Sequence, residues 1–191
     1  MNLLLQGSRL HKPYFEPLVI QDQTYCLNHL NPFQLVLPSE RARKDLRIHV
    51  RFTNHAFTSA YDAAAHDPAY PIIMDHGGRP RSFCELRYTL SHTLPGVISG
   101  FTHPATKVHQ TAAQRNWAHV TQIETPKGPY YVFFELRRAR KEDRHLQDLH
   151  LVVESAYPQD PSMPVPQLSG RMAFGLLCSK VYAGEPVSTR R

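Results

Sequence analysis

Residues 130–136, Tyr-Tyr-Val-Phe-Phe-Glu-Leu, form the most strand-like run of this 191-residue chain. Aromatic and β-branched side chains favour an extended backbone, so the run predicts a β-strand. A second such run, residues 149–157, follows a charged connection at 137–148, and residues 117–123 precede a turn at 126–129. These three runs and their connections predict an antiparallel meander in the C-terminal half of the chain.

An earlier strand is predicted from strict alternation. From Leu46 to Phe52 apolar residues alternate with polar ones, which is the period-two pattern of a half-buried strand. The apolar residues are then expected to face the core, while Arg47, His49 and Arg51 share the opposite face. Residues 1–40 contain four prolines and are expected to be irregular, apart from short strand-like runs.

One helix is predicted, from about Arg81 to Thr93. Ser82 and Glu85 have the spacing of a capping box, and Pro95 with the following glycine is expected to end the helix. Residues 54–80 before it are expected to form a loop region. Within the helix, apolar residues recur at helical spacing and predict a buried stripe: Phe83, Leu86, Leu90 and Leu94.

The order of these elements predicts an α+β domain, because most strands gather after the helix. We expect an antiparallel sheet of about four to five strands with the helix packed on one face. Residues 158–170 are rich in proline and are expected to form an extended loop, and residues 171–180 a final strand or a short helix. The expected organisation is an irregular N-terminal extension at 1–40, a single domain at 41–183 and a flexible tail at 184–191.

The composition is that of a folded protein without a membrane span. Hydrophobic residues make up 41% of the chain, which is enough for a core. No apolar run approaches the roughly 20 residues that cross a bilayer, and the opening residues lack the basic flank of a secretory signal. The three cysteines are widely spaced, which argues against a disulfide scaffold or a cysteine zinc site. A cytoplasmic protein with no membrane contact is expected.

The charge points to a polyanionic partner. The net charge is +6, the sequence pI is about 9.4, and 12 histidines add groups that titrate near neutral pH. Such a balance suits a protein that binds nucleic acid or cleaves phosphodiesters. A protein with a merely basic surface fits the charge equally well.

Cofactor and metal motifs are missing from the sequence. There is no glycine-rich phosphate loop, no dinucleotide fingerprint and no pair of histidines with the spacing of a metalloprotease helix. We therefore expect neither a cofactor nor a metal ion.

Three places carry candidate functional side chains. His55 follows the end of the predicted strand at 46–52, where loops on a rigid scaffold tend to hold catalytic groups. On the predicted helix, Arg87 can share a site with Ser91, and Tyr88 with Ser91 or His92, because residues three and four apart are neighbours. The alternatives are a solvated histidine in a turn and a helix whose polar face is simply wet.

The third place is the end of the strand at 149–157. Ser155 and Tyr157 lie two residues apart and project from the same face of the strand. A hydroxyl and a phenol at that position can hydrogen-bond a phosphate. The alternative is that they only end the strand before a proline.

The three places, in this order along the chain, resemble the barnase–EndoU–colicin–RelE group of small RNases, particularly members carried by phages and mobile elements. The motifs are Arg51-Phe52-Thr53-Asn54-His55-Ala56-Phe57, Arg87-Tyr88-Thr89-Leu90-Ser91 and Glu154-Ser155-Ala156-Tyr157. The chain also resembles uncharacterised bacterial proteins described as stationary-phase growth adaptation proteins. The motifs cover residues 47–158 and leave both ends unmatched.

The resemblance implies a metal-independent, toxin-like endoribonuclease. The ribose 2′-OH would attack the adjacent phosphorus and leave a 2′,3′-cyclic phosphate, with His55 as acid or base, Arg87 holding the phosphate and Ser155 orienting it. Tyr88 and Tyr157 are candidates for stacking a base or donating to phosphate. The implied substrate is RNA, such as tRNA or ribosome-associated RNA, and a toxin would have an antidote protein as partner.

Two other functions are consistent with the same residues. A non-catalytic protein could bind nucleic acid or a protein partner through basic residues without cleaving anything. A metal-dependent hydrolase could use several of the 12 histidines, brought together by folding. The catalytic group that the resemblance implies consists of His55, Arg87, Ser155 and Tyr157. The residues expected to contact RNA outside this group are Arg47, Arg51, Tyr88, Ser91, Arg137 and Arg138.

Overall fold

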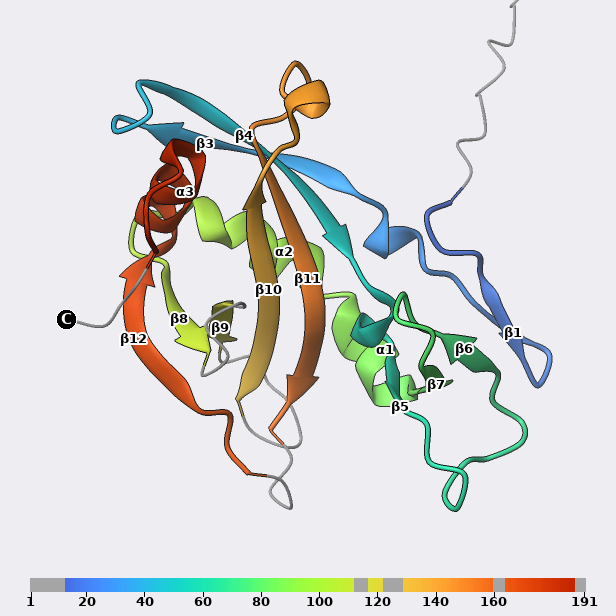
Figure 1. Cartoon of the computed structure of the whole chain (residues 1–191). Coiled ribbons are helices and arrows are strands. Elements are labelled where there is room, and N and C mark those ends of the chain that lie inside the picture. The colour runs from blue at the N-terminus through green and yellow to red at the C-terminus, as the bar shows by residue number, and fades with distance from the viewer. Residues whose placement is uncertain (1–12, 112–116, 122–128, 160–163, 188–191) are drawn as a thin grey trace, which may run out of the picture.

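The computed structural model describes residues 13–111, 117–121, 129–159 and 164–187 (Figure 1). Its centre is a seven-stranded sheet in which every neighbouring pair is antiparallel except β11 and β4, which run parallel. In spatial order the strands are β12 (Leu168–Ala173), β8 (Lys107–Thr111), β9 (Trp117–Thr121), β10 (Tyr130–Arg138), β11 (Leu149–Pro158), β4 (Lys44–Phe52) and β3 (Phe33–Ser39).

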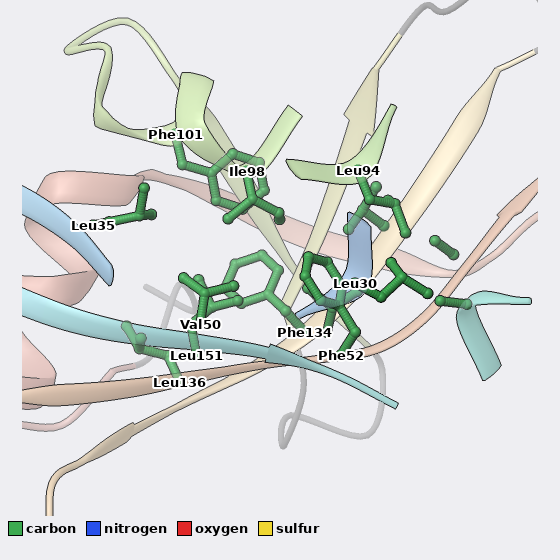
Figure 2. Close-up of a cluster of buried hydrophobic side chains, with 14 of the residues drawn as sticks. Leu30, Leu35, Val50, Phe52, Leu94, Ile98, Phe101, Phe134, Leu136 and Leu151 are labelled. Carbon is green, nitrogen blue, oxygen red and sulfur yellow. The ribbon is translucent and has the colours of Figure 1, made fainter. Parts of the chain in front are cut away.

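One face of this sheet forms the core, as the alternation in β4 predicts. Leu46, Ile48, Val50 and Phe52 are at most 1% exposed, while the polar residues between them face the other side. Figure 2 shows Val50 and Phe52 beside Phe134 of β10 and side chains from the helical layer. Burying a side chain of this size contributes roughly 1.5–3 kcal/mol, so this interface accounts for much of the stability. The helical layer that covers this face of the sheet comprises η1 (Asn28–Leu30), α2 (Leu94–Ser99), η3 (Gly100–Thr102) and α3 (Phe174–Ala183).

The α+β class is therefore confirmed, with a sheet larger than expected. Seven strands replace the four to five predicted, and β8 was not predicted at all. β3 is a full member of the sheet, although it lies within residues 1–40. The parallel pair arises because β11 returns to the middle of the sheet and aligns His150 with His49 of β4.

The segment 54–80, expected to be a loop, contains strands of a second sheet. Its order is β5-β7-β6, with β5 at Thr58–Ala60, β6 at Ile72–Met74 and β7 at Pro80–Phe83. Each of these strands has three or four residues, too few for a visible alternation in the sequence. Farther towards the N-terminus, β1 (Leu18–Ile20) and β2 (Gln23–Tyr25) form a separate hairpin.

The predicted helix is shorter and is followed directly by another. α1 spans Glu85–Ser91, and Ser82 belongs to β7 instead of capping the helix. Cys84 occupies the N-cap position without a side-chain hydrogen bond. Pro95 does not end a helix but lies in the first turn of α2, where its missing N–H would have no helical partner anyway.

The C-terminal part also differs in detail from the expectation. Residues 171–180 include both the end of β12 and most of α3, which ends at Gly184 in the left-handed conformation. Within the described part of the tail, Glu185 forms an ion pair with Arg41 at 2.6 Å. Residues 188–191, most of the turn predicted at 126–129 and part of the proline-rich segment lie outside the described residues.

A β-bulge in β11 sets the orientation of the predicted strand-end residues. Phe133 of β10 pairs with Ser155 and Phe134 pairs with Val153, which leaves Glu154 as the extra residue. After the bulge Ser155 and Tyr157 both alternate away from the buried Ala156. The shared face expected for them is therefore confirmed.

No helix within the described part of the chain is both long and apolar enough to cross a bilayer.

Candidate functional site

His55 lies where β4 stops and the chain leaves the large sheet. Thr53 ties this point to β11, because its N–H donates to the Val153 carbonyl at 3.0 Å and its hydroxyl donates to the Glu154 carbonyl at 2.8 Å. The same hydroxyl accepts from the His55 N–H at 3.3 Å and caps the short helix η2 (Asn54–Ala56). His55 is thus fixed beside the bulge of β11.

The imidazole of His55 is paired with a buried carboxylate. Its Nε2 lies 3.1 Å from Oδ2 of Asp75, whose side chain is 2% exposed against 21% for His55. Asp75 begins the turn between β6 and β7, and it also accepts hydrogen bonds from the N–H groups of Gly77 and Arg79 and from Nε of Arg79. These bonds, the backbone bond from Arg79 foremost, hold the pKa of Asp75 well below its usual value.

Two arginines from other elements lie near His55. Arg87 of α1 donates from Nη1 to the His55 carbonyl at 3.2 Å, and its guanidinium lies 5.1 Å from the centre of the Tyr157 ring. Arg81 of β7 donates to the hydroxyl and the carbonyl of Thr58 at 2.7 and 3.0 Å. Burial and the positive charge of Arg87 lower the pKa of Arg81 to about 10, which Asp75 partly opposes, so Arg81 remains charged at neutral pH.

These side chains line an open pocket of about 490 Å³ at the end of β11. The pocket contains His55, Arg87, Ser155 and Tyr157, the four side chains singled out from the sequence as a catalytic group. They come from η2, α1 and β11, and the fold brings these separate parts of the chain together. The remaining wall is largely apolar and includes Ala60, Leu86, Pro158 and Pro164.

Arg87 forms no ion pair with a described carboxylate, whereas Arg81 feels the negative charge of Asp75. Arg87 is largely buried, and burial lowers its pKa, yet its neighbours are a carbonyl, a thiol and the phenols of Tyr130 and Tyr157. Among the described residues that line the pocket there is no carboxylate. A buried cation without a partner is costly, which is typical of a site that receives an anionic ligand.

The pKa of His55 is lowered by burial and by the charge of Arg81, and Asp75 only partly offsets this. The imidazole is therefore mostly neutral at pH 7 and can accept a proton. Nε2 is the ring nitrogen that contacts Asp75, and Nδ1 makes no hydrogen bond with a described residue. A carboxylate that fixes one ring nitrogen leaves the other oriented for acid–base chemistry.

Tyr157 is not a free stacking platform. Its ring stacks on Phe133 with a centroid distance of 5.4 Å and an interplanar angle of 23°, and Arg87 covers it as well. Burial raises the pKa of its phenol, so the hydroxyl keeps its proton through the neutral range. Tyr157 is placed to donate a hydrogen bond or a proton rather than to stack a base.

Tyr88 and Ser91 do not join Arg87 in the pocket. Ser91 is fully buried, donates to the Tyr88 carbonyl at 2.6 Å and contacts Nε2 of His29 at 2.7 Å. The Tyr88 hydroxyl donates to the Cys26 carbonyl, and its ring packs edge-on against Tyr25. These two residues connect α1 to the N-terminal segment, which is a structural role that helical spacing alone does not distinguish from a binding face.

The remaining expected RNA contacts divide into two groups. Arg47 is used internally, because it donates to the carbonyls of Arg144 and His145 and lies 3.5 Å from Asp148. In contrast, Arg51, Arg137 and Arg138 line a hollow of about 720 Å³ on the outer face of the sheet.

Three residues of the site were missed by the sequence analysis: Asp75, Arg79 and Arg81. Asp75 stands two residues before Gly77, the spacing at which an aspartate accepts a hydrogen bond from the backbone in a turn. That signal was present in the sequence, but it indicates a turn and not a partner for His55. No cluster of three or more histidine, cysteine or acidic side chains suited to a metal ion occurs in the described segments.

Comparison with known proteins gives one match. The model of the YjaZ family covers residues 17–182, and the chain therefore belongs to the YjaZ family. No curated protein and no protein of known structure matches the chain.

Proposed function

We propose that this member of the YjaZ family is a metal-independent endoribonuclease whose site is the pocket around His55 and Arg87. The observation that carries the proposal is a pocket whose described lining holds Arg81 and Arg87 but no carboxylate, beside a histidine that is held by Asp75. Arginine binds phosphate through a planar fork of donors, and a phosphodiester supplies the negative charge that the described lining of the pocket lacks.

The reaction proposed here begins with His55 as the base. Its neutral imidazole takes the proton of a ribose 2′-OH, and the 2′-oxygen forms a bond to the adjacent phosphorus. Arg87 and Arg81 neutralise the charge that develops on the phosphoryl oxygens, and the Ser155 hydroxyl donates to one of them. Each of these groups lines the pocket.

The second half of the reaction needs an acid. As the bond from phosphorus to the 5′-oxygen breaks, Tyr157 donates its phenolic proton to that oxygen. A water molecule then carries the proton from His55 back to Tyr157, which restores both groups. The products are a 2′,3′-cyclic phosphate on one fragment and a 5′-hydroxyl on the other.

The test is cleavage of a labelled single-stranded RNA in the presence of a strong chelator. We expect fragments that end in 2′,3′-cyclic phosphate, and no cleavage where the 2′-OH is replaced by hydrogen. Replacing His55 by alanine should reduce the rate at least about 100-fold, the usual contribution of one acid–base group. Arg171→Ala, which removes an exposed arginine of β12 that lines none of the hollows described here, is the matched control.

Two outcomes would end the proposal. Cleavage that the chelator abolishes points to a metal-dependent hydrolase. RNA that is retained by the protein but stays intact over a series of salt concentrations points to a non-catalytic binding protein. In either case the positive pocket would need another explanation.

A further inference from the structure

We infer that the substrate is an extended single strand of RNA. It runs from the Arg87 pocket across the outer face of the sheet to Arg140, with a base stacked on Tyr14 midway. This inference deepens the proposed function and rests on it. Its carrying observation is a chain of three hollows on the protein surface.

The three hollows share residues and so form one continuous groove. His55 lines both the Arg87 pocket and a middle hollow of about 510 Å³. The middle hollow shares Arg51, His76, Val152 and Glu154 with the far hollow of about 720 Å³. Along β11 the groove follows residues 150–157, a length of roughly 23 Å at the usual rise of a strand. A dinucleotide is too short to occupy all of it.

The charge of the groove suits a polyanion. Seven arginines line the three hollows, against four carboxylates among the residues described. Three of those carboxylates already face cationic or titratable groups: Asp75 bonds Arg79 and His55, Glu135 bonds Arg137 at 2.7 Å, and Asp143 lies 3.7 Å from His150. In the far hollow Arg51 and Arg140 form no ion pair with a described carboxylate, which leaves them available to phosphate, whereas the Arg138 guanidinium lies 5.3 Å from the centre of the Tyr182 ring.

An exposed aromatic side chain in the middle hollow distinguishes a nucleic acid from an acidic polypeptide. Tyr14 is 45% exposed and its ring packs edge-on against Phe15 with centroids 4.8 Å apart. Its N–H is fixed by the Asn31 side chain at 3.1 Å. Proteins that hold single strands combine a cationic groove with aromatic rings on which bases stack, and this groove has both.

The groove is tested by binding, independently of cleavage. The probes are fluorescein-labelled oligodeoxyuridylates of 3 and 12 nucleotides, which lack the 2′-OH and cannot be cut by the proposed reaction. We expect the wild-type protein to bind the 12-mer at least about 30-fold more tightly than the 3-mer. Tyr14→Ala should weaken 12-mer binding roughly 10-fold, the loss of one stacked base.

Charge variants give a second readout. Arg140→Ala should lower the slope of log affinity against log salt for the 12-mer by about 0.7, the value for one phosphate contact with a single strand. Arg171→Ala, at the far edge of the sheet, should leave both affinity and slope within the error of the measurement.

The outcomes separate the groove from the enzyme. Equal affinity for 3-mer and 12-mer, or an Arg140→Ala slope equal to that of wild type, overturns the groove whatever the cleavage assay shows. Displacement of the 12-mer by polyglutamate of equal charge at equal concentration also overturns it, because the site would then select charge alone. If the groove binds as expected while His55→Ala still cleaves RNA normally, the catalytic assignment fails and the groove stands.

Discussion

Two clusters of histidine, tyrosine and serine flank helix α1, and they differ in where their polar groups find partners. In the first cluster His29, Tyr88 and Ser91 bond each other or the backbone of the N-terminal segment. The second cluster consists of His55, Ser155 and Tyr157 around Arg87. These residues line an open pocket with no carboxylate in its described lining. Nearly the same residue types serve packing in one place and are available to a ligand in the other.

This difference predicts that one cluster contributes mainly to folding stability and the other mainly to RNA binding. The internally bonded cluster should contribute to folding and be indifferent to RNA. The pocket should do the reverse, because a largely buried guanidinium with no described carboxylate partner opposes folding and is retained for what it binds. Substitutions on the two sides of α1 can therefore break or sharpen the comparison.

The largest expected effect is that of Arg87→Met. Methionine keeps the length and the apolar contacts of the stem but removes the charge, so the rate of RNA cleavage should fall at least about 100-fold. The free energy of unfolding in a urea titration should stay the same or rise by about 1 kcal/mol, since a buried charge without a counter-ion is removed. A clear loss of stability would show that Arg87 is a structural residue, and the contrast between the two clusters would disappear.

Substitutions around His55 give a smaller, graded effect on the pH profile. The lowered pKa of His55 means that kcat/KM rises with pH through a midpoint below 6.5 and is level above it. Arg81→Gln removes a neighbouring positive charge, so the His55 pKa rises and the midpoint shifts to higher pH. Asp75→Asn removes a negative charge, so the midpoint shifts to lower pH.

The plateau of the same profile separates positioning from charge. Asp75→Asn should lower the plateau by no more than about 100-fold, because the imidazole loses the group that fixes its orientation but stays in the site. Profiles of both variants against wild type in a chelator-containing buffer provide the measurement. Shifts of the two midpoints in the same direction would contradict the assignment of His55 as the base.

The sequence predicted the core of the fold because its signals are local. Strict alternation correctly predicted that Leu46 and Phe52 are buried in the core. The apolar stripe did the same for Leu90 and Leu94, although the predicted helix was longer than α1. The short strands of the second sheet carry no periodicity of their own, and they form because β7 pairs with β5 and β6 across distant segments. Such pairing is decided by tertiary contacts that propensity does not contain.

The candidate site was predictable as a set of residue types but not as a set of partners. His55, Arg87 and Ser155 could be chosen because each stands at the end of a recognisable element or on its polar face. Asp75 could not, because its relation to His55 depends on how a 20-residue connection folds back. For the same reason Ser91, four residues from Arg87 on one helix, was grouped with the site, although it points to the opposite cluster.

The smallest expected effect concerns the stability of the internally bonded cluster as a function of pH. Burial, together with the positive charge of His92 when it is protonated, lowers the pKa of His29 to about 4 from a usual 6.5. Between these values the unfolded chain binds a proton that the folded protein does not, so the free energy of unfolding falls as the pH is lowered from 6.5 towards 4. His29→Gln should remove on the order of 1 kcal/mol of this pH dependence, after allowance for solvent screening, and leave RNA cleavage within about twofold of wild type. Urea titrations at pH 7 and pH 5 measure the first quantity. A variant that keeps the full pH dependence but loses cleavage would place His29 with the pocket instead, and the two sides of α1 would no longer be distinct.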